Sequence, residues 1–182
     1  MLGVGSTATL AAWTDEEHAS GEFTAGSFSI VGSTNGVDFG DQPNAPEAAL
    51  DFAVNPGSMV PGTTVYALYS VKTAENSVAG SVRLSAGESN QNELGKYLSY
   101  GVNAVAGITC DAASFSAGTP VLAVNSPLTD GSGASLNLAA AGTTTINFCF
   151  AVTLPKDASN DAQGTDLTAT WAFAATTDRA GN

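Results

Sequence analysis

The sequence predicts an all-β protein, an antiparallel β-sandwich of the jelly-roll type with about eight or nine short strands and long loops. Three observations lead to this prediction. Short stretches alternate apolar and polar residues with a period of two, which is typical of half-buried strands. Clusters of Gly, Pro, Asn, Asp and Ser separate these stretches and supply turn geometry. No long stretch shows the apolar period of an amphipathic helix, and no internal repeat indicates a solenoid.

The first half of the chain is expected to contribute strands at 23–31, 50–54, 65–72 and 81–86. Gly26 interrupts the alternation of the first and indicates a bulge or bend. In the third, both faces are partly apolar, which predicts a central strand. One of its faces carries Val65, Ala67, Tyr69 and Val71, and the other carries Tyr66, Leu68 and Ser70.

The second half is expected to contribute strands at 96–105, 120–125, 143–154 and 167–175. Residues 92–94 could form a short helical turn, and 110–116 could be a loop or one turn of helix. The strand at 143–154 alternates most clearly, and Pro155 ends it. Its period of two and that of the last strand predict four core aromatic residues, Phe148, Phe150, Trp171 and Phe173.

The charge balance narrows the possible partners. The 182 residues contain 17 Asp and Glu against 5 Lys and Arg, a formal net charge of -12. Nucleic acids and anionic membranes attract clustered Lys and Arg, so nucleic acid is excluded as a partner. No apolar stretch reaches the roughly 18 residues that span a bilayer, so no stable membrane insertion of the mature chain is expected.

The chain has two cysteines, Cys110 and Cys149. In an exported protein an even number of cysteines favours a disulfide. Closing this loop would stabilise the fold by about 3–4 kcal/mol on the chain-entropy model. The alternative is a pair of buried free thiols.

Residues 1–12 are apolar, small and uncharged, and an acidic stretch follows them. This junction is typical of a secretory leader, with cleavage by signal peptidase between Ala12 and Trp13. Because no positively charged segment precedes the leader, we expect the natural chain to begin upstream of Met1. The alternative is an ordinary N-terminal strand or tail. The expected organisation is a leader (1–12), an extended segment (13–21), one sandwich domain (22–178) and a tail (179–182).

Residues 11–15 form a small-small-aromatic-x-Asp junction, and residues 23–30 follow as Phe-x-x-Gly-x-hydrophobic-x-hydrophobic. A Pro-Gly turn at 60–65 precedes a strand, and 160–164 precede a closing aromatic strand. In these features the chain resembles the TasA/camelysin family, exported biofilm-matrix fibre proteins with an alternate, SipW-dependent signal peptide. The resemblance covers both ends and the middle, but not residues 86–140. It implies that the segment beginning at Trp13 supplies a strand to the next subunit.

Catalytic chemistry has little support. His18 is the only histidine, whereas a catalytic zinc takes about three protein ligands and commonly two His. The metallopeptidase label of the camelysin branch is therefore not carried over, and neither an enzyme nor a cofactor is expected. The acidic residues concentrate in turns, where solvation explains them and a weak Ca²⁺ site stays conceivable. They include Asp38, Asp41, Glu47, Asp130, Asp157 and Asp161.

We therefore expect a secreted structural protein of the cell surface or biofilm matrix. Open sheet edges must be covered or used, and a freed segment can add a strand to a neighbour. Head-to-tail contacts of this kind do not close, so copies of the chain would form fibres. The expected contact residues are Trp13, Thr14, Asp15, Glu16, Glu17 and His18. The alternatives are a monomeric adhesin that binds through loops 32–48 and 126–135 and, less favoured, a camelysin-type peptidase.

Overall fold

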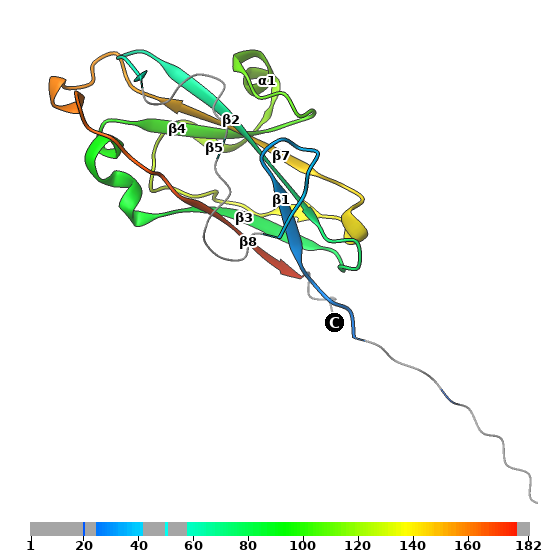
Figure 1. Ribbon diagram of the computed structural model, residues 1–182. Helices are drawn as coiled ribbons and strands as arrows, with labels where there is room; N and C mark the ends of the chain where they lie inside the picture. The colour runs from blue at the N-terminus through cyan, green and yellow to red at the C-terminus, as the bar shows by residue number, and fades with distance from the viewer. Residues whose placement is uncertain (1–19, 21–24, 42–49, 51–57, 178–182) are drawn as a thin grey trace, which may run out of the picture.

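The computed structural model describes residues 20, 25–41, 50 and 58–177. Within these ranges the chain forms eight strands in two antiparallel sheets that face each other (Figure 1). The prediction of an all-β antiparallel sandwich is confirmed. The strands are β1 (Ile30–Ser33), β2 (Thr64–Thr73), β3 (Gly80–Ala86), β4 (Ser99–Val105), β5 (Thr119–Pro127), β6 (Leu136–Leu138), β7 (Ile146–Thr153) and β8 (Trp171–Thr177).

The two sheets differ in size. The larger sheet has five strands in the order β1-β2-β7-β4-β5, and the smaller has three in the order β6-β3-β8. β7 is central, because Cys149 pairs with Leu68 of β2 on one side and with Asn103 of β4 on the other. β2 is also an inner strand, as its two partly apolar faces predicted.

Aromatic rings fill the space between the sheets. Phe173 of β8 lies 4.9 Å from Tyr69 and 4.8 Å from Phe148, measured between ring centroids. Trp171 lies 5.2 Å from Phe150. These contacts confirm the core positions predicted from the period of two in β7 and β8.

A second apolar cluster covers the outer face of the larger sheet. It consists of Leu68, Val105, Phe115, Cys149 and Ala151. The helix α1 (Ala112–Ala117) places Phe115 in this cluster. A disulfide joins Cys110, which precedes the helix cap Asp111, to Cys149 of β7, with Cα atoms 5.3 Å apart. The predicted disulfide is therefore present, and the alternative of free thiols is excluded.

The prediction of a strand at 23–31 is largely wrong. Residues 25–29 form only a single bridge, between Ser27 and Ser77, and β1 begins at Ile30. The cause is local: the carbonyl oxygens of Ser27 and Ser29 accept hydrogen bonds from the loop residues Val78 and Ala74 instead of from a strand. Apart from Leu50, the strand predicted at 50–54 lies outside the described residues.

Short helices account for the later starts of β4 and β7. The predicted helical turn at 92–94 overlaps η3 (Glu93–Lys96), which follows η2 (Glu88–Gln91). Because η3 ends at Lys96, β4 begins only at Ser99. β7 begins only at Ile146, because η4 (Ala140–Gly142) precedes it. η5 (Asn160–Ala162) lies between β7 and β8. In the described ranges, no helix is long and apolar enough to cross a membrane.

Candidate functional site

Among the described strands, the two open sheets have four edges, β1, β5, β6 and β8. Two of the edges are protected. Gly32 of β1 exchanges two backbone hydrogen bonds of 2.9 Å with Gly40, so its own loop covers that edge. β5 carries Pro120 and Pro127 and an irregular register, with Asn125 at φ 66°. Proline and bulges protect an edge strand from pairing with another chain.

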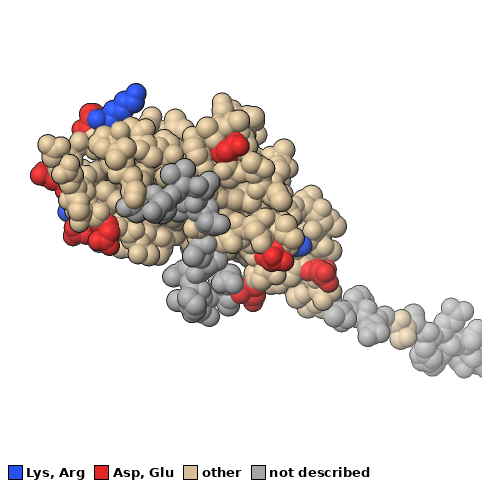
Figure 2. All heavy atoms as spheres, turned by 45° about the horizontal axis from the view of Figure 1, so that its top comes forward, with Lys and Arg blue, Asp and Glu red and all other residues tan. Residues whose placement is uncertain are grey.

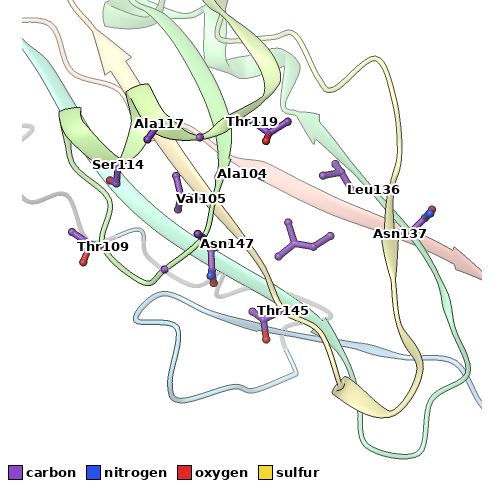
Figure 3. Close-up of a pocket in the computed structure, with 14 residues that line it drawn as sticks. Ala104, Val105, Thr109, Ser114, Ala117, Thr119, Leu136, Asn137, Thr145 and Asn147 are labelled. Atoms are coloured by element: carbon purple, nitrogen blue, oxygen red, sulfur yellow. The ribbon is translucent and has the colours of Figure 1, made fainter.

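β6 borders a hollow in the described part of the molecule. This hollow, here called the β6 groove, has a volume of about 670 Å³ and lies between β6 and α1, across the ends of β4 and β7 (Figure 3). Its volume is in the range of binding clefts, about 300–1,000 Å³. The lining residues are Ala104, Val105, Ala106, Gly107, Thr109, Ser114, Ala117, Gly118, Thr119, Leu136, Asn137, Thr145, Ile146 and Asn147.

The wall formed by α1 is fixed in place by local hydrogen bonds and by the disulfide. Asp111 caps the helix: its carboxylate accepts a 2.8 Å bond from the Ser114 backbone N–H and a 2.9 Å bond from the Ser114 hydroxyl. These two donors lower the pKa of Asp111. At the other end of the helix, the Asn103 amide donates a 2.7 Å bond to the Phe115 carbonyl oxygen.

The floor of the groove is anchored in the larger sheet. Ile146 lines the groove and also packs against the main core, while Asn147 is fixed by a 2.7 Å bond that the buried Ser70 hydroxyl donates. Leu136 lines the groove from β6 and packs against the main core. No lining residue is charged. The groove therefore suits an apolar or uncharged side chain.

The described residues before β1 lie against the loop that connects β2 of the larger sheet to β3 of the smaller sheet. The Ser27 hydroxyl donates a 2.8 Å bond to the carbonyl oxygen of Asn76, and the Val78 N–H donates a 2.9 Å bond to the Ser27 carbonyl oxygen. Ala25, Gly26 and Ser27 are exposed. Traced backwards from Ser29 to Ala25, the chain passes this loop and extends beyond the end of the sheets (Figure 1).

Other predicted site residues stay apart or cannot be placed. The junction Ala12–Trp13 and the segment from Trp13 to His18 lie outside the described residues. Asp38, Asp41, Asp130, Asp157 and Asp161 are exposed, and Figure 2 shows Asp and Glu at several places on the visible face. Within the described ranges, no three His, Cys, Asp or Glu side chains gather as a metal site would require.

The loops of the adhesin alternative are held by internal hydrogen bonds. Arg83 donates a 3.0 Å bond to the Ser132 carbonyl oxygen and a 2.6 Å bond to that of Gly133, which holds the loop after β5 against β3. Ser33 and Asn35 similarly accept the backbone N–H groups of the described loop 34–38. Loop 32–48 is described only as far as Asp41.

Sequence reasoning missed β6 and the groove beside it. The only signal was the alternation Leu136-Asn137-Leu138, which is shorter than any window used to recognise a strand.

Comparison of the chain with protein-family models and with curated proteins finds no match in either set.

Proposed function

We propose that this chain is an exported structural protein that assembles into fibres by adding its N-terminal segment to the sheet of a neighbouring copy. The observation that carries the proposal is the combination of an exposed N-terminal exit at Ala25–Ser27 with an edge strand, β6, that borders an open groove. A sheet edge presents unpaired N–H and C=O groups, and an extended segment pairs with them by β-augmentation.

Two further features support export and a structural role. The disulfide between Cys110 and Cys149 suits an oxidising environment outside the cytosol. The β6 groove has no charged lining residue, so within the described residues it offers no paired acid–base groups for catalysis. A fibre subunit needs a rigid domain and a complementary segment, and no reactive centre.

Deleting residues 1–21 tests the proposal. We expect the full mature chain, which begins at Trp13, to form fibres that light scattering and negative-stain microscopy detect, and the chain without residues 1–21 to remain monomeric. A chain that lacks residues 179–182 serves as the control and should assemble like the full chain. If the chain without residues 1–21 forms fibres as readily as the full chain, the proposal is wrong. A full chain that stays monomeric at every concentration would instead favour the adhesin alternative.

A further inference from the structure

We propose that Asn35 is the site of a slow covalent modification, the loss of its side-chain amide nitrogen, and that this change opens the loop that covers the β1 edge. This loop, here called the β1 cover, consists of residues 34–40. Its last residue, Gly40, exchanges two backbone hydrogen bonds of 2.9 Å with Gly32 of β1. The modification takes place within a single copy of the chain, so it is independent of assembly.

The β1 cover contains the only Asn-Gly pair of the sequence, Asn35-Gly36. Glycine has no side chain to shield its backbone nitrogen, so this nitrogen can approach the side-chain carbon Cγ of Asn35. The turn requires glycine here, because Gly36 has a φ of 73° and a Cβ on it would clash with the Ile108 side chain. The geometry of the turn therefore retains the susceptible pair.

The modification needs no reactant other than water. The Gly36 backbone nitrogen forms a bond to Cγ of Asn35, the bond between Cγ and Nδ2 breaks, and Nδ2 leaves as ammonia with the proton that the Gly36 nitrogen gives up. Water then opens the resulting cyclic imide, which leaves a carboxylate as aspartate or isoaspartate. Asn35 is exposed, so water reaches it.

Hydrogen bonds restrain the reacting groups while the chain is folded. The Gly36 N–H donates a 2.9 Å bond to the Ser33 hydroxyl oxygen, which stabilises the proton that must leave. The Ser33 hydroxyl in turn donates a 2.8 Å bond to Oδ1 of Asn35. Oδ1 also accepts 2.9 Å bonds from the N–H groups of Val37 and Asp38. The modification is therefore slow in the folded chain, and Ser33, which contacts both reacting groups, controls its rate.

The modification replaces an attraction within the β1 cover by a repulsion. Nδ2 of Asn35 donates a 2.8 Å bond to the Asp38 carboxylate. A carboxylate at position 35 would instead place two negative charges in contact, which is unfavourable. Because the same loop leads to Gly40, its rearrangement would break the two bonds to Gly32 and expose the backbone groups of the β1 edge.

Incubation of the folded chain followed by peptide mass spectrometry tests the modification site. Ser33→Ala should speed the loss of the amide at Asn35 about tenfold, because it removes the hydrogen bonds to both reacting groups. Thr34→Ala is the matched control, since Thr34 is not among the described partners of the Asn35 side chain. The rate at Asn76, an exposed residue of another loop, should be the same in all three proteins.

Two outcomes of the incubation would overturn the proposal. An Asn35 that keeps its amide in Ser33→Ala while Asn76 loses its own would show that Asn35 is not the modification site. Equal rates at Asn35 in Ser33→Ala, in Thr34→Ala and in the unaltered chain would show that Ser33 does not control the reaction. An intact disulfide and an unchanged circular dichroism spectrum verify that both variants fold.

Asn35→Asp introduces the product carboxylate directly and tests the opening of the loop. The N–H groups of Gly32 and Gly40 should exchange with solvent about tenfold faster or more in this variant, as NMR measures residue by residue. Asn35→Asp combined with Asp38→Asn exchanges the amide and the carboxylate between the two positions and should restore slow exchange. Unchanged exchange in Asn35→Asp, or fast exchange that the double variant does not slow, would overturn the proposed opening.

Discussion

Asn90 is a buried amide that joins three separate parts of the chain. From η2 its side-chain nitrogen donates a 3.1 Å bond to the Leu128 carbonyl oxygen and a 2.8 Å bond to that of Thr170. Its side-chain oxygen accepts a 2.8 Å bond from the Thr170 N–H. The residue is 0% exposed, so water cannot replace these partners.

Asn90→Ala should therefore lower the free energy of unfolding by about 3 kcal/mol, because the Leu128 carbonyl oxygen and the Thr170 N–H lose the bonds that Asn90 makes to them. Urea denaturation measures the loss. Asn92→Ala, at an exposed neighbouring position, is the control and should change stability by no more than about 0.5 kcal/mol. Similar midpoints for the two variants would show that Asn90 does not hold these segments together.

Tyr100 makes the stability of the fold sensitive to high pH. Burial raises the pKa of its phenol from 10.0 to about 12, and its hydroxyl donates to the Asp130 carbonyl oxygen. The unfolded chain thus loses this proton at a lower pH than the folded chain. The stability that the neutral phenol contributes is complete below pH 10 and is lost as the pH rises toward about 12.

We accordingly expect the urea midpoint to fall between pH 10 and 12, and to fall less in Tyr100→Phe, which has no proton to lose. Tyr97→Phe, with its ring only partly buried, is the matched control and should follow the unaltered chain. If the urea midpoint falls equally in Tyr100→Phe and in the unaltered chain, groups other than Tyr100 cause the fall.

At the scale of the element, the disulfide connects α1 to the middle of the larger sheet. The bond closes a sequence separation of 39 residues, and Cys149 is 0% exposed within the outer cluster. Cys110→Ala together with Cys149→Ala should lower the free energy of unfolding by about 3–4 kcal/mol, since the unfolded chain regains the entropy of the open loop.

Denaturation with and without a reducing agent checks this value. The unaltered chain should lose stability when reduced, and the double variant should not respond to the reducing agent. An unaltered chain with the same urea midpoint in both conditions would contradict a stabilising role for the bond.

The long inner strands could be predicted from the sequence, whereas the groove could not. β2 and β7 repeat their alternation over eight or more residues, and two cysteines allow a single pairing. β6 has only three residues. It is a strand because it pairs with Gly80–Val82, residues that are distant from it in the sequence. The groove arises from the unequal widths of the sheets and from the position of α1, which no local pattern encodes.

For the whole molecule, the net charge of -12 opposes the approach of two copies. We expect assembly to be slow at low ionic strength and faster near 0.15 M salt, where the Debye length is about 8 Å. Light scattering at a fixed protein concentration follows the rate. The chain without residues 1–21 should not assemble at any salt concentration, which distinguishes fibre growth from salting-out. Slower assembly of the full chain at higher salt would show that attraction between charges drives the contact.

The disulfide that links Cys110 to β7 has a mechanical consequence. If copies join through the wall that α1 forms, tension along a fibre passes from that wall through a covalent link into a strand that is hydrogen-bonded on both sides. The backbone hydrogen bonds of β7 to β2 and to β4 then share this tension. Reduced fibres should therefore break at a lower pulling force than oxidised ones.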